Sequence, residues 1–245
     1  MNWRLLMDGP GEGAWNMAID EAILEAHRLG ESPATLRLYR WVCPTISLGY
    51  AQRVPEAQLR VWREAGATLV RRPTGGRAVL HTADVTYSVV TQGLPDSVSA
   101  SYRLLSAPLV SALASLGLQA GLMPGEGRAA RELGCFAQAT PADLTAGGAK
   151  ICGSAQVRRQ GTVLQHGTMY LRRAKEFDWL SDTAQARTLT ELLARPLGWQ
   201  EVAHAIQEAF QQHFPGSWRP GVLSEDERRR AELRRPSYEV DIPPA

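Results

Sequence analysis

Two short glycine-containing segments carry the side chains best suited to chemistry. In the first, RRPTGGRAVLH at residues 71–81, arginines and a histidine flank a glycine pair. Glycines let backbone amides approach a ligand closely, arginine supplies a permanent charge, and histidine can donate or accept a proton. The segment therefore predicts a site for a carboxylate, a phosphate or a thioester oxygen, formed by Arg72, Gly75, Gly76, Arg77 and His81. The same glycines would also suit a tight hairpin turn, and the spacing matches neither a GxxxxGK nor a GxGxxG loop.

The second segment, GGAKICGSAQ at residues 147–156, places a lysine and a cysteine two residues apart. Alternate side chains of a strand point to the same face, so Lys150 and Cys152 are expected to share one. The small residues after them leave room for a slender ligand in a narrow channel, or equally permit close packing. A histidine follows in QHGT at 165–168. The candidate binding residues of this region are Gly153, Ser154, Ala155 and His166.

Lysine is scarce in this chain. Of the 27 basic residues only two, Lys150 and Lys175, are lysines. An ammonium can lose its proton or act as a compact charge, in ways that a guanidinium cannot. Lys150 is therefore a candidate catalytic residue, whereas Lys175, beside Arg172 and Arg173, is expected to be incidental.

The three cysteines are Cys43, Cys135 and Cys152. They lack the paired spacing of a metal site, and an odd number argues against a disulfide framework, so at least one free thiol is expected. Cys152 is a candidate nucleophile because it lies close to Lys150 in the sequence. Cys43, just before Pro44, is expected to be a small buried hydrophobe.

Helices and short strands alternate irregularly along the chain, which predicts an α+β fold with a mainly antiparallel sheet rather than a doubly wound one. Asn16 is expected to cap the first helix and Ser224 the last, with Glu227 completing a capping box. A hairpin is expected at Gln160–Gly161, and the strands at 35–41 and 45–50 are expected to be adjacent. The expected helices are 16–28, 55–65, 101–116, 199–214 and one from 224. The expected strands are 35–41, 45–50, 67–72, 77–81, 84–90, 150–159 and 162–171. The stretch 117–148 is expected to be loop-rich, and the tail after 236 to be extended or disordered.

Five motifs in a fixed order resemble those of the lipoate-protein ligase A and octanoyltransferase family, which shares its fold with the biotin protein ligases. The resemblance covers roughly residues 3–215. It implies a catalytic domain at residues 1–220, followed by a charged helix and tail at 221–245. The motifs are NMAIDEAI (16–23), PTISLGY (44–50), RRPTGGRAVLH (71–81), KICGSAQVRR (150–159) and LQHGT (164–168).

Cys135 decides which chemistry the resemblance implies. It lies in a GCF step at 134–136, upstream of the lysine strand, as in octanoyltransferases of the LipM type. The ATP-dependent ligases need no thiol, and the segment after Phe214 is too short for the extra domain of the best-known bacterial ones. A cysteine thiol has a pKa of about 8.5, which a nearby ammonium lowers. The resemblance thus implies that Cys135 attacks an acyl thioester and that Lys150 stabilises the oxyanion, with Lys150 also able to take a proton from the incoming amine.

The implied donor is octanoyl-acyl carrier protein, and the implied acceptors are lipoyl domains such as the glycine cleavage H protein or a 2-oxoacid dehydrogenase E2 subunit. No cofactor is expected. Carrier and lipoyl domains are commonly acidic, which makes the arginine pairs at 71–72, 158–159 and 172–173 candidate docking residues, although strand edges also carry such pairs. Three alternatives remain: an ATP-dependent lipoate or biotin ligase, a lipoyl-domain amidotransferase, and a non-catalytic lipoyl-domain binding subunit.

Composition narrows the partners further. The net charge of +2 does not favour a nucleic-acid partner. The first residues lack a basic leader followed by an apolar stretch, and no apolar run is long enough for a membrane span, so a cytoplasmic protein without membrane contact is expected. The absence of heptads or a long apolar seam favours a monomer.

Overall fold

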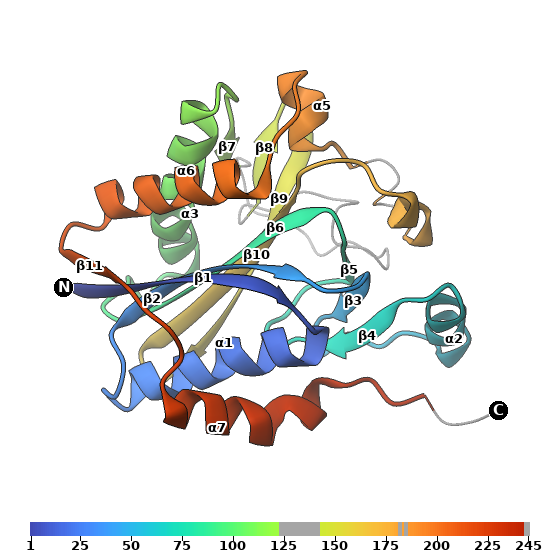
Figure 1. Ribbon diagram of the computed structural model, residues 1–245, viewed down its shortest axis with the longest axis horizontal. Helices are drawn as coiled ribbons and strands as arrows, with labels where there is room; N and C mark the ends of the chain where they lie inside the picture. Colours follow the sequence, from blue (N-terminus) through green and yellow to red (C-terminus); the bar gives the residue numbers. More distant parts are fainter. Residues whose placement is uncertain (123–142, 181–182, 184–185, 243–245) are drawn as a thin grey trace.

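The computed structural model describes residues 1–122, 143–180, 183 and 186–242, and within them two sheets form the framework (Figure 1). The larger sheet has the order β11–β1–β2–β6–β10–β9–β8–β7, and its pairs are antiparallel except that β1 runs parallel to β2 and β11. This confirms the expected α+β fold. In that order the strands are Ser217–Pro220, Asn2–Gly11, Ala34–Trp41, Asp84–Thr91, Thr162–Tyr170, Ala149–Arg159, Leu144–Ala146 and Gly121–Leu122.

Helices cover both faces of the larger sheet: α3 and α6 lie on one face, while α1 packs between the other face and α7 (Figure 1). Strand β2 shows why both faces are covered. Its Leu36 and Leu38 join the core beneath α3 and α6, whereas Tyr39 and Trp41 point to the α1 side. The helices are α1 (Gly13–Arg28), α3 (Val98–Ser115), α6 (Trp199–His213) and α7 (Glu225–Arg234).

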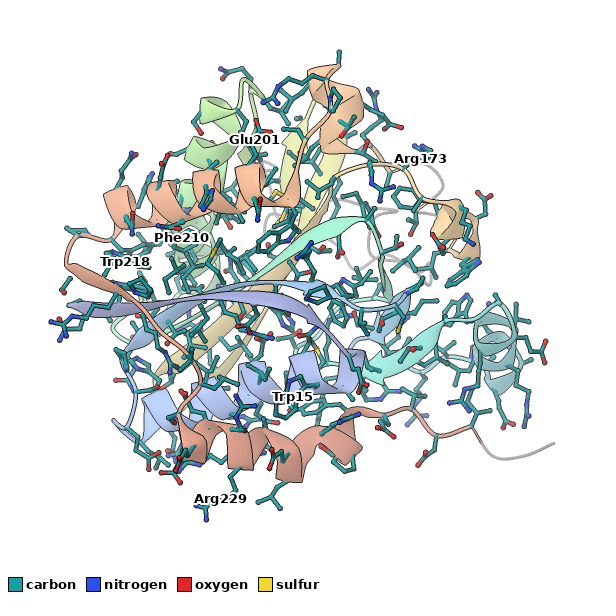
Figure 2. All side chains as sticks on the ribbon, viewed as in Figure 1. Trp15, Arg173, Glu201, Phe210, Trp218 and Arg229 are labelled. Carbon is teal, nitrogen blue, oxygen red and sulfur yellow. The ribbon has the colours of Figure 1, made fainter. Side chains whose placement is uncertain are left out.

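The apolar stripe of α6 lies where its helical spacing predicts. Val202, Ile206 and Phe210 are fully buried against the sheet. Figure 2 shows Phe210 pointing toward the sheet, whereas Arg229 of α7 points away from the protein. The expected helix at 199–214 is therefore confirmed.

The smaller sheet has β3 (Thr45–Leu48) at its centre, parallel to β4 (Thr68–Arg71) and antiparallel to β5 (Val79–His81). The expectation that the strands at 35–41 and 45–50 are adjacent was wrong, because β2 belongs to the larger sheet. The apolar side chains of β3 explain the separation: Ile46 and Leu48 pack with Trp62 of α2 (Glu56–Glu64) in a core of their own.

The glycine loop, residues 72–78, connects β4 to β5. These strands do not pair with each other, since β3 lies between them. The tight hairpin turn considered from the sequence is therefore wrong, and the loop instead crosses the end of the smaller sheet. The hairpin at Gln160–Gly161 is confirmed, with φ of 48° and 82° at the two turn residues.

Two helices begin earlier than expected, α1 at Gly13 and α3 at Val98. Helix α1 begins at Gly13, and Asn16 does not cap it, because the Asn16 side chain donates to the carbonyls of Gly11 and Arg40. At α7 the capping box of Ser224 and Glu227 is present as expected.

The C-terminal segment packs against the body of the protein. Glu227 of α7 is fully buried and accepts two hydrogen bonds from Arg4 of β1, at 2.7 and 2.6 Å. Beyond α7, Tyr238 is buried and Glu239 forms an antiparallel bridge with Val70 of β4. Of the two expectations for the tail after residue 236, the extended one fits Glu239, and the disordered one was wrong as far as residue 242.

Shorter elements complete the described structure: α5 (Leu189–Leu193) and the 3-10 turns Lys175–Trp179 and Arg235–Tyr238. The stretch expected to be loop-rich contributes β7 and β8 near its ends. Within the described residues, no helix is both long and apolar enough to span a membrane.

Candidate active site

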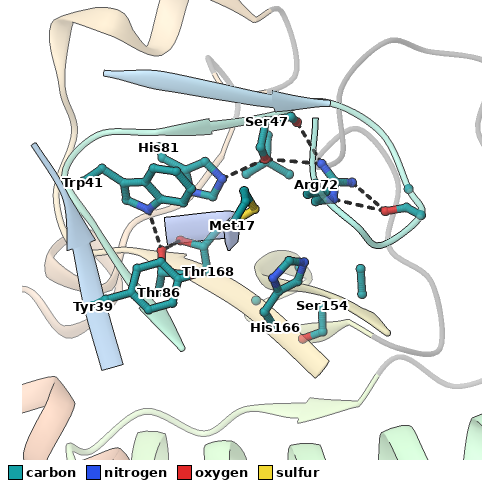
Figure 3. Close-up of a pocket in the computed structure, with 16 residues that line it drawn as sticks. Met17, Tyr39, Trp41, Ser47, Arg72, His81, Thr86, Ser154, His166 and Thr168 are labelled. Carbon is teal, nitrogen blue, oxygen red and sulfur yellow. Dashed lines mark hydrogen bonds between the residues drawn. The ribbon is translucent and has the colours of Figure 1, made fainter. Parts of the chain in front are cut away.

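One cleft lies where the two sheets meet, and Figure 3 shows its walls. The structure brings both predicted segments to it, and its lining includes every predicted binding residue except Arg77. The lining residues are Met17, Tyr39, Trp41, Ser47, Arg72, Gly75, Gly76, Val79, His81, Thr86, Gly153, Ser154, Ala155, His166, Gly167 and Thr168.

Arg72 holds the glycine loop in shape. Its Nη2 donates to the carbonyls of Gly75 and Arg77, both at 2.7 Å, and its Nη1 donates to the Ser47 carbonyl at 2.8 Å. Gly76 has a φ of +98°, a conformation that favours glycine. Arg77 therefore contributes its backbone to the loop, and its side chain is not part of the cleft lining.

Arg71 is also engaged with the backbone. Its Nη1 donates to the carbonyls of Gly49, Tyr50 and Gln52. The pair Arg71–Arg72 is thus occupied by the protein's own backbone, which argues against the docking role considered from the sequence.

His81 connects Ser47 to Asp84. Its Nδ1 lies 2.9 Å from the Asp84 carboxylate, and its Nε2 lies 2.9 Å from the Ser47 hydroxyl. Burial lowers the pKa of His81 although Asp84 opposes the shift, so the imidazole is neutral at physiological pH. Because a carboxylate only accepts, Nδ1 donates to Asp84 and Nε2 accepts from Ser47. The ring stacks on Trp41 at 3.9 Å, which fixes its plane in the cleft wall (Figure 3).

His166 occupies a similar position on the opposite wall. Its Nδ1 lies 3.2 Å from the Asp20 carboxylate, and its Nε2 lies 2.6 Å from the Thr74 hydroxyl of the glycine loop. A helix residue, a strand residue and a loop residue are thus joined through one imidazole. His166 positions the loop from the α1 side.

Asp20 is the centre of a buried network on α1. It accepts hydrogen bonds from Arg37 at 2.8 Å, Tyr39 at 3.0 Å and Ser88 at 2.8 Å, in addition to the contact with His166. Burial raises the pKa of Asp20, but the hydrogen bond with His166 and the charge of Arg37 outweigh it and lower the pKa overall. Asp20 is therefore a carboxylate that holds one wall of the cleft.

Lys150 forms a buried ion pair with Asp143. The two atoms Nζ and Oδ2 are 2.8 Å apart, and the two side chains are 4% and 2% exposed. The other carboxylate oxygen of Asp143 accepts the backbone N–H of Ser154 at 3.4 Å. Lys150 is not among the residues that line the cleft, and Asp143 links it to a residue that does.

A β-bulge separates Lys150 from Cys152. Leu144 of β8 pairs with Cys152 and the next residue, Thr145, pairs with Lys150, so Ile151 is an extra residue in β9. The strict alternation assumed from the sequence therefore does not hold here. Cys152 is fully buried in the hydrophobic core, which argues against its role as a nucleophile.

The predictions for the other two cysteines have different outcomes. Cys135 lies outside the described residues, so its predicted role stays a prediction. The expectation that Cys43 is buried was wrong, because the side chain is half-buried with its Sγ 3.3 Å from the Thr68 hydroxyl.

Sequence reasoning missed four partners of the histidines. Asp20, Ser47, Thr74 and Asp84 lie in or near the recognised motifs, yet nothing in local spacing pairs them with His81 or His166. The one signal was an acidic residue on the buried side of an amphipathic helix at Asp20.

The chain is similar to known proteins over most of its length. The family model of the lipoyl protein ligase A/B catalytic domain matches residues 12–211. The octanoyltransferase LipM of Kyrpidia tusciae is 39% identical, with 98% of this chain and 97% of the relative covered. That of Symbiobacterium thermophilum is 38% identical, with 94% and 93% covered.

Solved structures agree in fold. A lipoate-protein ligase A with bound ATP has a TM-score of 0.82 at 28% identity, covering 96% of this chain and 95% of the other. A bipartite lipoate protein ligase of Thermoplasma acidophilum, described with its E2 lipoyl domain, has a TM-score of 0.78 at 25% identity, covering 96% and 92%.

Proposed function

Because the chain belongs to the lipoyl protein ligase A/B catalytic family, we propose that it is an octanoyltransferase of protein lipoylation whose acyl group passes from acyl carrier protein to a lipoyl domain through Cys135. Octanoyl transfer is supported by several LipM octanoyltransferases that are 33–39% identical over nearly the whole chain. The acceptor is a lysine of a lipoyl domain, such as the glycine cleavage H protein or an E2 subunit. The Thermoplasma ligase, described with an E2 lipoyl domain, supports that acceptor class.

The reaction proceeds through two acyl transfers. The Cys135 thiolate attacks the thioester carbonyl, the carbon–sulfur bond to the carrier breaks, and the carrier leaves as its thiol after taking up a proton. The neutral amine of the acceptor lysine then attacks the new thioester. The amide forms, and the departing Cys135 sulfur takes the proton that the nitrogen loses. An amide is more stable than a thioester, so no ATP is consumed.

The lining of the cleft is the observation that carries the proposal. Met17, Trp41 and Val79 offer apolar surface, and Gly153 and Ala155 keep the opposite wall low. Such a cleft suits an unbranched acyl chain, because its burial needs apolar contact and little width. The loop held by Arg72 closes one end with backbone groups that can face an acyl oxygen.

Intact-protein mass spectrometry tests the covalent step. The purified protein is mixed with octanoyl-acyl carrier protein, without ATP and without acceptor. We expect one octanoyl adduct that peptide mapping places on Cys135, and none in the Cys135→Ala variant. Full transfer activity in that variant would refute the cysteine intermediate.

A second candidate is an ATP-dependent lipoate ligase, favoured by the similarity to the ATP-bound lipoate-protein ligase A. The same assay separates the two functions. Acylation of a lipoyl domain that requires free octanoate, ATP and magnesium, with no adduct from the carrier thioester, would support the ligase. Transfer from an octanoylated lipoyl domain in preference to the carrier would indicate an amidotransferase.

A further inference from the structure

The ion pair of Asp143 and Lys150 is unusual in its burial. Its Nζ–Oδ2 distance is 2.8 Å, and both side chains are almost inaccessible to water. Most other pairs between arginine and a carboxylate in the described residues have at least one substantially exposed partner; the pairs of Arg4 with Glu227 and of Arg37 with Asp20 are the clearest exceptions.

Burial makes the charge of Lys150 depend on Asp143. An isolated ammonium in the protein interior loses its hydration, which favours the neutral amine. A carboxylate at 2.8 Å reverses that preference, because Coulomb attraction is strong where little water screens it. Removing the carboxylate would take away a buried counter-charge and so shift the balance toward the neutral amine.

Asp143 also fixes the place of that charge. Its Oδ1 accepts the backbone N–H of Ser154, a residue of the cleft wall, while its Oδ2 pairs with Lys150. The bulge at Ile151 sets Lys150 out of the regular alternation of β9. One carboxylate therefore ties the ammonium to the backbone of the strand that lines the cleft.

We infer that Asp143 is a positioning residue that holds Lys150 as an ammonium throughout turnover, so that Lys150 acts through its positive charge and not as a general base. The catalytic part of this inference rests on the proposed octanoyl transfer. It removes the proton-accepting role of Lys150 considered from the sequence, and the departing sulfur takes the proton instead.

Among the described residues, three titratable groups on neighbouring elements have surroundings of their own. Tyr87 of β6 bonds to Ser154 and Gln165, and burial raises its pKa well above the ordinary value, so it is a neutral phenol. Glu191 of α5 pairs with Arg173. Cys152, two residues along β9, lies in the hydrophobic core.

The scarcity of lysine makes the charge of Lys150 directly measurable. Labelling the protein with lysine enriched in ¹³C at Cε gives signals from Lys150 and Lys175 alone. The exposed Lys175 is assigned with a Lys175→Arg variant, which removes one signal. An NMR titration of the unliganded protein then follows the Lys150 ammonium without any assay of activity.

In the wild type we expect the midpoint of the Lys150 titration near or above the ordinary lysine value of about 10.4, so that Lys150 is still charged at about pH 9. In Asp143→Asn the midpoint should fall by at least about one pH unit, and Asp143→Glu should restore most of the shift. A wild-type Lys150 whose midpoint lies below about pH 9 would overturn the inference, even if every variant failed to fold. An unchanged midpoint in a folded Asp143→Asn protein would overturn it as well.

Glu227→Gln is the matched control. It removes a carboxylate from another buried ion pair, with Arg4, that does not line the cleft. We expect this variant to lose stability but to keep the Lys150 titration of the wild type. A shift of equal size in Glu227→Gln would mean that the effect reports general loosening and not Asp143.

Kinetics of octanoyl transfer test the effect of Asp143 on catalysis. Asp143→Asn should lower kcat for octanoyl transfer by at least about tenfold, and its rate should fall with rising pH at the lower midpoint measured by NMR. A rate that instead rises as Lys150 loses its proton would identify a general base and contradict the inference. If the protein proves not to transfer octanoyl groups, the NMR result still decides the charge of Lys150 by itself.

Discussion

Replacing Asp20 by asparagine should destabilise the protein far more than its similar size suggests. Asparagine keeps one acceptor oxygen but places an NH₂ group against donors that the carboxylate now satisfies, from Arg37, Tyr39 and Ser88. It also leaves the buried guanidinium of Arg37 without its fully buried counter-charge.

The expected loss is about 3–5 kcal/mol in the free energy of unfolding, the typical cost of breaking a buried ion pair from one side. At about 2–4 °C per kcal/mol for a domain of this size, the melting temperature should fall by roughly 6–20 °C. Urea unfolding at pH 7 followed by circular dichroism measures the first quantity, and a thermal scan measures the second.

Asp8→Asn is the matched control, since Asp8 bonds to the same Arg37 at 2.6 Å but is 32% exposed. Solvent screening limits the value of such a pair to about 1 kcal/mol or less. If Asp20→Asn costs no more than Asp8→Asn, the buried network does not hold the cleft wall as argued.

Three further outcomes are expected. Burial lowers the pKa of His81, so the stability that its neutral form contributes is complete above the unfolded-state pKa of about 6.5 and is lost as pH falls through the folded-state pKa. In urea unfolding, the stability advantage of the wild type over His81→Gln should therefore shrink as pH falls below about 6.5. Ala155→Leu should narrow the cleft and lower kcat/KM for octanoyl donors at least about tenfold relative to butyryl donors, and equal losses for both would contradict the assigned wall. Gly167→Ala should cost about 1–3 kcal/mol, since its Cβ would lie 2.6 Å from the Gly153 carbonyl oxygen, whereas Gly121→Ala, with open space around it, should change the urea midpoint little.

The elements that local pattern determines could be predicted from the sequence. The stripe Val202, Ile206 and Phe210 repeats at helical spacing, and the turn at Gln160–Gly161 needs only two residues with positive φ. In both cases the signal and the structure it specifies lie within a few residues of each other.

Pairings between distant segments could not be predicted in the same way. The strand signal at Thr45–Leu48 is correct, but its assignment to a second sheet depends on partners at 68–71 and 79–81. The bulge at Ile151 depends on the register with β8, which the sequence of β9 alone does not specify.

The candidate site could likewise be predicted only in part. Its glycine loop and the strands that carry its other residues are contiguous motifs, so Arg72, His81 and His166 could be placed in the cleft from the sequence. The bonds that orient them cross as many as 146 residues, as between Asp20 and His166, and come from elements whose packing no local pattern reveals.

The position of β1 within the larger sheet has a consequence for the order of folding during synthesis. Strand β1 is made well before β11, yet its neighbours in the sheet are β2 on one side and β11 on the other. The charge of Arg4 is likewise paired only once Glu227 has been made. During synthesis the emerging chain therefore exposes an open strand edge and an unpaired cation until β11 and α7 have been made.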